Sequence, residues 1–294
     1  MSTDALAAAL AELPLVDHHV HGALRDDVDR AGLELMLTES DRPVPPWMTQ
    51  FDSQIGFAVR RWCAPVLGLA AHAAPDDYLA RRHELGAAEV TRRLLAASGI
   101  DHYLLETGYG GAEILGTDEM SRASGRPVDE IVRLESVLEE VARSGVAAAD
   151  LPERFRETLT ARTVNAVGLK SIVAYRFGFD FDPARPADDE VTAAAGAWLA
   201  ECARTGTVRV TDPVLLRFVL WSGVDRGCPS NCTPDTAIRT WSCTAAIRCC
   251  SPGSSGACSR TASTCCCCTA TPSTATPAIW RRCSRMSSSM SGSG

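Results

Sequence analysis

The stretch LPLVDHHVHG at positions 13–22 decides the fold, because a short apolar run ends there in the pattern H-x-H. Leu15, Val16 and Val20 suit a buried parallel strand. Two residues that are separated by one residue on a strand point to the same side, so the imidazoles of His19 and His21 can reach one metal ion. His18 points the other way and is interpreted as a packing or supporting residue. The stretch therefore predicts a metal site at the end of the first strand.

Strand and helix patterns alternate beyond this motif. Further strands are predicted over 100–105, 131–135 and 167–173, although 129–143 also keeps helical spacing. Helices are predicted over 4–12, 54–67, 76–97, 151–163, 188–204 and 212–225. Such alternation implies a parallel sheet. The predicted fold class is α/β of the (β/α)8 TIM-barrel type, with only about the first four β/α units present in residues 1–227.

Length and composition are those of an ordinary soluble globular protein. The chain has 294 residues, of which 46% are hydrophobic and 22% charged. The first residues carry Asp4 and Glu12 and no basic group, unlike a secretory signal, and no stretch reaches the length of a membrane span. We expect a cytoplasmic enzyme that acts on a small molecule, without nucleic-acid or membrane partners.

The composition changes abruptly near residue 227. Eleven of the 13 cysteines follow this position, whereas all six histidines precede it. Residues 228–294 contain a single acid, Asp235, and almost no branched aliphatic residues. This Cys/Ser/Thr-rich segment, 228–294, is predicted to be irregular. It can be interpreted as a disulfide-rich module, a metal cluster or a low-complexity tail.

A fourth interpretation of the segment 228–294 is a frameshift. Reading one base earlier converts a cysteine that follows a cysteine into leucine, and a threonine that follows a cysteine into histidine or tyrosine. Residues 228–234 then become L-P-I-Q-L-H-T, and residues 265–276 become V-L-L-L-H-C-Y-P-F-H-R-H. Both hidden strings have the form of buried strands that end in histidine. We therefore favour a frameshift in the gene or in its sequencing.

The motifs VDHHVHG at 16–22 and GLKSIVAYR at 168–176 resemble those of the amidohydrolase superfamily. The likeness is greatest to its amidohydrolase-related branch, which includes decarboxylases, and it covers residues 13–227. The resemblance implies a divalent metal, most often zinc, held by His19 and His21. It also implies histidine ligands after strands five and six and an aspartate after strand eight. Those ligands are absent from the frame as printed, so the chain is expected to be truncated and inactive.

The resemblance also suggests roles for residues near the fourth strand. A lysine at its end bridges two metals when carbamylated in some members, and a basic group there holds a substrate carboxylate in others. Lys170, the chain's single lysine, and Glu135 are the predicted catalytic residues, and Tyr175 and Arg176 are predicted to bind substrate. Glu106 is a candidate supporting acid at the end of the second strand.

Three functions remain open from the sequence. The first is a metal-dependent hydrolase, in which metal-activated water attacks an amide, ester or related bond. The second is a decarboxylase on the same scaffold. The third is a non-catalytic metal-binding or redox protein that uses the cysteine-rich segment. Homo-oligomers are a further expectation for the full-length family, and His72, His83 and His102 are interpreted as surface or core residues.

Overall fold

The computed structural model describes residues 12–38, 42–228 and 230–232. The chain forms two compact units, Met1–Glu130 and Ile131–Gly294, and the two are described separately below. The helix predicted over 4–12 and almost all of the segment 228–294 lie outside the described residues. The predicted domain boundary near residue 227 stays a prediction.

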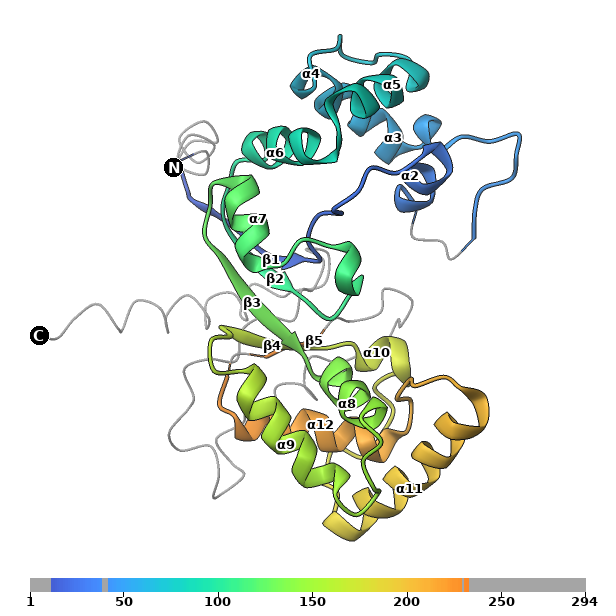
Figure 1. Ribbon diagram of the computed structural model, residues 1–294, viewed down its shortest axis with the longest axis vertical. Helices are drawn as coiled ribbons and strands as arrows, with labels where there is room; N and C mark the ends of the chain where they lie inside the picture. Colours follow the sequence, from blue (N-terminus) through green and yellow to red (C-terminus); the bar gives the residue numbers. More distant parts are fainter. Residues whose placement is uncertain (1–11, 39–41, 229, 233–294) are drawn as a thin grey trace, which may run out of the picture. The chain divides into compact units, whose positions relative to one another are not determined.

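The first unit contains the parallel strands β1 and β2 and the start of β3, together with a run of short helices (Figure 1). Its elements are β1 (Leu15–Val20), α2 (Arg30–Met36), η1 (Gln50–Asp52), α3 (Gln54–Ala58), η2 (Val59–Cys63), α4 (Ala64–Val66), α5 (Pro75–Leu85), α6 (Ala87–Ala97), β2 (Ile100–Glu106), η3 (Gly111–Glu113), α7 (Thr117–Ser124) and β3 (Val128–Arg133), which continues into the second unit. The strand predicted over 100–105 is confirmed as β2.

β1 and β2 pair in parallel, but β1 is far less buried than predicted. Leu15 and Val16 are 49% and 51% exposed. The reason is that β1 is the first strand of the sheet order and pairs with β2 alone among the described residues. On β2, Tyr103 and Leu105 are fully buried and pack with Met120 of α7. Tyr103 and Leu105 therefore face the helices. The residues that alternate with them along β2 point to the opposite face of the sheet.

The helices between the strands follow the predicted pattern with two differences. Residues 54–66 are helical throughout, as α3, η2 and α4, but η2 is a π-helical turn. The single helix predicted over 76–97 is wrong, because the chain breaks at Gly86 between α5 and α6. Gly86 has φ +76°, a left-handed backbone conformation that ends a helix at low cost only for glycine. Spacing alone does not reveal this break, since leucine positions on both sides keep the same period.

The second unit begins at Ile131 and contains the end of β3 and two further parallel strands. Its elements are α8 (Leu134–Arg143), α9 (Leu151–Arg162), β4 (Gly168–Ser171), α10 (Val173–Arg176), α11 (Asp188–Thr205), α12 (Pro213–Asp225) and β5 (Ser230–Cys232). β3 pairs in parallel with β4, and β4 pairs in parallel with β5. The helices predicted over 151–163, 188–204 and 212–225 are confirmed, each within one or two residues at either end.

Three boundaries differ from the prediction in this unit. The strand expected over 131–135 occupies Val128–Arg133, and α8 begins directly at Leu134. The strand expected over 167–173 is shorter, because the chain turns into α10 at Val173. The segment 228–294 is not irregular at its start, since residues 230–232 form β5 beside β4. A parallel neighbour supplies the hydrogen bonds that this polar tripeptide needs.

The core of the second unit lies between its helices and one face of the sheet. Val132 of β3 and Leu169 of β4 pack into a single cluster with residues of α8, α9, α11 and α12, the helices grouped beside β4 and β5 in Figure 1. Gly223 lets α12 approach closely, since a Cβ there would stand 3.1 Å from a methyl of Leu134. Asp212 caps α12 by accepting from two backbone N–H groups of its first turn.

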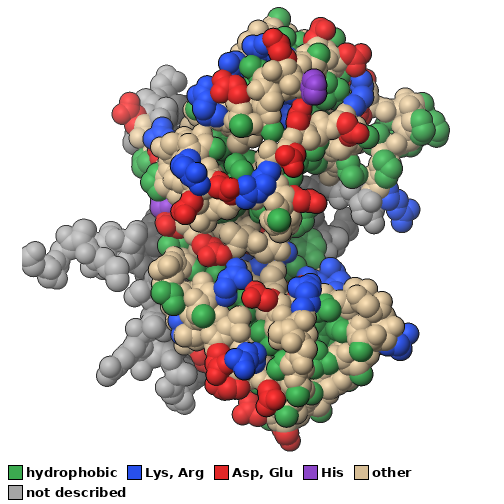
Figure 2. Space-filling view, in the orientation of Figure 1, with side chains coloured by type: hydrophobic (Ala, Val, Ile, Leu, Met, Phe, Trp, Pro, Cys, Tyr) green, Lys and Arg blue, Asp and Glu red, His purple; other side chains and the backbone are tan. Residues whose placement is uncertain are grey.

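The described surface is of mixed charge. On the face drawn in Figure 2, acidic and basic side chains are interspersed over the helices, and many form exposed pairs such as Arg204 with Glu201. No helix among the described residues is long and apolar enough to cross a membrane.

Candidate metal centre

The two histidines of the H-x-H motif lie side by side where β1 ends. The ring centroids of His19 and His21 are 5.5 Å apart, with the rings nearly perpendicular. The register between β1 and β2 shifts between Asp17 and Val20, and the Asp17 carboxylate accepts a hydrogen bond from the backbone N–H of His19. This irregularity turns the end of the strand. His18 is exposed beside them.

A buried carboxylate holds the second of these histidines. Glu106, the last residue of β2, is only 1% exposed. Its Oε2 lies 3.0 Å from Nδ1 of His21, and its Oε1 accepts a hydrogen bond from the backbone N–H of Gly108 at 2.6 Å. Glu106 alternates along β2 with the helix-facing Tyr103 and Leu105, so it lies on the same side of the sheet as His21. The sequence marked Glu106 only as a strand-end acid and could not reveal its partner.

Backbone and side-chain contacts join the loop that follows β1 to the segment that follows β2. Leu24 and Ile114 form an antiparallel bridge, and the Arg25 guanidinium makes a two-pronged ion pair with Glu119. Tyr109, in the loop between β2 and Ile114, is 59% exposed, and its ring centroid is 5.1 Å from that of His21. The loops thus place an aromatic ring beside the histidines.

Lys170 is buried on the inner side of the second unit's sheet. It is 3% exposed and is the register partner of Arg133, which is 8% exposed. Register partners in parallel strands point to the same face, and the preceding residues Val132 and Leu169 face the helices. Lys170 and Arg133 therefore share the face opposite the helical core. In a barrel this face is the interior, where catalytic side chains gather at the strand ends.

Glu135 lies in the first turn of α8 rather than at a strand end. Its side chain is completely buried, and its Oε1 accepts hydrogen bonds from the Ser171 hydroxyl at 2.5 Å and from the backbone N–H of Ile172 at 3.0 Å. Its Oε2 has no hydrogen-bond partner among the residues that the structure describes. Burial raises the pKa of the Glu135 carboxyl, although these hydrogen bonds and the nearby Arg176 oppose the shift. The acid predicted near Lys170 is thus linked to the end of β4 through Ser171.

The two predicted substrate-binding residues have very different surroundings. Tyr175 is 53% exposed. The side chain of Arg176 is 6% exposed and pairs with Glu139, whose Oε1 lies 3.0 Å from its Nη2. Burial lowers the pKa of the Arg176 guanidinium. Its Nε and Nη1 are buried and have no hydrogen-bond partner within the described part of the chain. The carboxylate of Glu139 therefore holds Arg176 in place, and the ion pair uses only the Nη2 donor of the guanidinium.

The remaining histidines lie apart from the motif. The side chain of His83 is 92% exposed. His102 forms a half-buried pair with Asp129, and His72 has a positive φ of 62°.

Two adjacent imidazoles suit a divalent metal, since zinc is commonly held by histidine nitrogens. The set is incomplete, because no group of three or more His, Cys, Asp or Glu side chains has metal-binding geometry within residues 12–38, 42–228 and 230–232. The histidine pair and its buried carboxylate fit part of a zinc site.

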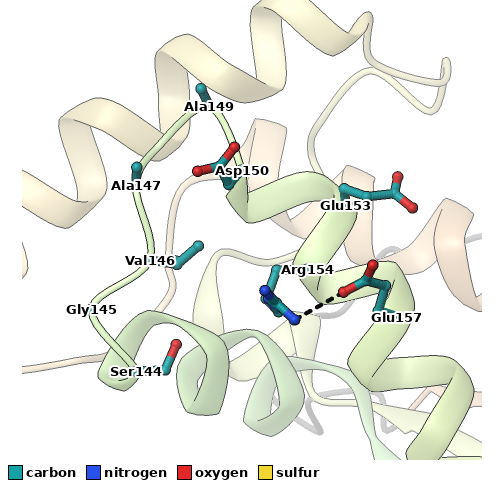
Figure 3. A pocket seen from close by; sticks show the side chains of 9 residues that line it. All are labelled: Ser144, Gly145, Val146, Ala147, Ala149, Asp150, Glu153, Arg154 and Glu157. Carbon is teal, nitrogen blue, oxygen red and sulfur yellow. Dashed lines mark hydrogen bonds and ion pairs between the residues drawn. The ribbon is translucent and has the colours of Figure 1, made fainter.

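A surface depression of about 470 Å³ lies away from all these residues. It is formed by residues 144–150 and the first turns of α9, and Figure 3 shows Asp150, Glu153 and Glu157 around Arg154. Arg154 is paired with Glu157 at 3.0 Å. The depression begins where α8 ends. α8 is ten residues long and starts at Leu134, so its two ends are about 15 Å apart. It is thus remote from the strand ends where Lys170 lies.

Comparison with known proteins identified one relevant structure. The chain is similar to a "putative metal-dependent hydrolase" from Lactobacillus casei, with 23% identity and a TM-score of 0.59. The match covers 78% of this chain but only 60% of the other protein. No protein-family model and no curated protein matches the chain. The likeness shows a shared α/β fold with parallel strands, consistent with part of a TIM-barrel-like fold.

Proposed function

We propose that this chain represents the N-terminal part of a metal-dependent hydrolase of the amidohydrolase type, in which His19 and His21 supply two ligands to a zinc ion. The observation that carries the proposal is the pairing of His21 with the buried Glu106, next to His19. Metal-binding histidines commonly donate their second ring N–H to a carboxylate of this kind. The name of the Lactobacillus casei protein agrees with this class of activity.

Lys170 and Glu135 are the proposed catalytic residues of the complete enzyme. Lys170 and Arg133 provide positive charge on one face of the sheet, which suits a carboxylate or another oxyanion of the substrate. The raised pKa of Glu135 suits a group that holds and releases a proton. A bound divalent metal would supply Lewis acidity that polarises a carbonyl group. Tyr175 and Arg176 remain proposed contacts to substrate.

We further propose that the chain is truncated by a frameshift near residue 227. β5 lies beside β4 as the fifth parallel strand, over residues 230–232. The frame one base earlier encodes L-P-I-Q-L-H-T over 228–234, which puts a histidine codon at position 233, directly after β5. In the amidohydrolase superfamily a ligand histidine follows the fifth strand. Resequencing codons 224–230 locates the shift: a base that differs from the printed sequence places it in the sequencing, and the printed bases place it in the gene. Stop codons in the frame one base earlier, between codons 228 and 276, contradict the proposal.

Zinc binding by the full chain tests the metal site. We expect titration calorimetry to give a zinc affinity that falls at least tenfold in His19→Ala and in His21→Ala. His83→Ala is the matched control, since it removes an exposed histidine of the same unit, and it should leave the affinity unchanged. Equal zinc affinity in the wild type and in the double variant His19→Ala/His21→Ala would exclude the site.

A decarboxylase is the second candidate, favoured by the buried cations Lys170 and Arg133, which suit a carboxylate substrate. CO2 release from aromatic carboxylates, assayed with the frame-restored chain, separates this reaction from hydrolysis. Zinc that survives loss of both histidines but is lost when cysteines of the segment 228–294 are replaced would instead support the non-catalytic metal-binding alternative.

A further inference from the structure

Each carboxylate oxygen of Glu106 lies within hydrogen-bond distance of a partner in the loop that follows β2 or at the end of β1. Oε1 accepts from the backbone N–H of Gly108, a group that can only donate. Oε2 faces Nδ1 of His21 at 3.0 Å. When Glu106 is ionised, its carboxylate only accepts hydrogen bonds, and Nδ1 of His21 then carries the proton of this bond. A neutral imidazole has a single N–H, and its other nitrogen then presents a lone pair.

We propose that Glu106 is a positioning residue that fixes His21 as the Nδ1–H tautomer and so assigns Nε2 as its metal-binding nitrogen. This inference rests on the proposed metal site, and it adds to that site a residue outside the H-x-H motif. Burial of Glu106 strengthens the effect, because a buried hydrogen bond faces little competition from water. Such supporting carboxylates typically change metal affinity 10–100-fold.

The substitution Glu106→Gln makes this inference testable because it should reverse the tautomer. The backbone N–H of Gly108 still needs an acceptor, so the amide oxygen of glutamine is expected to stay on that side. Its NH2 group then faces Nδ1 of His21 and can only donate to it. The proton of the imidazole must move to Nε2, where it blocks the lone pair that the metal requires. Glutamine has nearly the same shape as glutamate, so the fold should be retained.

The first experiment measures the tautomer without metal. The full chain is labelled with 15N-histidine, and two-bond 1H–15N spectra at neutral pH identify which His21 nitrogen carries the proton. We expect Nδ1–H in the wild type and Nε2–H in Glu106→Gln. The matched control is Glu113→Gln, an exposed acid seven positions along the same loop, which should leave the His21 spectrum unchanged. An Nε2–H tautomer in the wild type, or no change in Glu106→Gln, overturns the inference.

The second experiment measures zinc affinity in the same three proteins. We expect a 10–100-fold loss in Glu106→Gln and none in Glu113→Gln. If Glu106 were itself a metal ligand, affinity would fall without the change of tautomer in the metal-free protein, and that result rejects a positioning role. Absence of zinc binding in the wild type would reject the proposed metal site, whereas the tautomer would still test what Glu106 does to His21.

Discussion

The Glu139–Arg176 pair allows a quantitative test of what holds the second unit together. Both side chains are more than nine-tenths buried, and Arg176 Nη2 lies 3.0 Å from Glu139 Oε1. The same carboxylate oxygen accepts from the backbone N–H of Val210 at 3.0 Å. Glu139→Gln removes the negative charge but keeps the shape of the side chain. The buried guanidinium, whose pKa burial already lowers, then loses its partner.

We expect Glu139→Gln to lower the free energy of unfolding by about 3–5 kcal/mol, the usual cost of leaving a buried charge unpaired. The next residue gives a matched control. Glu140 pairs with Arg162 at 2.9 Å, but both side chains are substantially exposed. Glu140→Gln removes the same charge from the same helix and should cost only about 0–1 kcal/mol. Urea unfolding of the full chain at low protein concentration, followed by circular dichroism, measures both values.

A second pair of variants separates the ion pair from other effects of the substitution. Arg176→Met in the Glu139→Gln background removes the guanidinium that has lost its charged partner, and it should recover part of the lost stability. Together with the two single variants it forms a double-mutant cycle, for which we expect a coupling energy of at least about 1 kcal/mol. Equal costs for Glu139→Gln and Glu140→Gln, or a coupling near zero, would refute this account. Arg176 would then be available to a substrate rather than committed to the fold.

Three further results are expected. Burial raises the pKa of the Glu135 carboxyl above its ordinary 4.5. The stabilisation that the protonated group gives is complete below that pH and is lost as the pH rises through the pKa of the folded state. Glu135→Gln should therefore gain stability relative to wild type as the pH rises above 4.5, and a pH-independent difference in urea midpoints contradicts this. Gly56→Ala would place a Cβ 2.0 Å from the carbonyl oxygen of Gln50 and should destabilise the first unit by about 3 kcal/mol or more, measured by thermal unfolding. The open edge of β1, with Leu15 and Val16 half exposed, should cause aggregation of the printed chain, and a monodisperse light-scattering profile would rule that out.

The sequence was sufficient where local chemistry determines structure. The end of α11 at Gly206 and the start of α12 at Asp212 follow from a left-handed glycine and a capping carboxylate, both of which act within one turn. The H-x-H pair is equally local, since two residues on one strand carry it. The strand predicted over 131–135 is present as β3, but its predicted end was wrong because a tertiary contact decides where the helix begins. Glu135 turns into α8, where it accepts from Ser171 and Ile172, far along the chain.

The candidate site was predictable only in part for the same reason. His19 and His21 are visible as a motif, but the contact between His21 and Glu106 joins residues 85 positions apart. No spacing rule in a single sequence links them. The burial of Arg176 is also a tertiary effect, because its pairing with Glu139 depends on how α8 and α10 pack. The sequence predicted that Arg176 contacts substrate, whereas in the structure its side chain pairs with Glu139.

The loop that follows β2 is fixed at both ends and exposed between them. Glu106 holds its start through Gly108, and the bridge between Leu24 and Ile114 holds its end. Changes in length or sequence around Tyr109 can therefore accumulate without shifting the register of either strand. This arrangement favours evolutionary divergence at that loop: descendants of one ancestor could acquire different substrate preferences there while the histidine pair stays in place. For the same reason, a library randomised at the loop tip is a practical route to altered selectivity in a frame-restored enzyme.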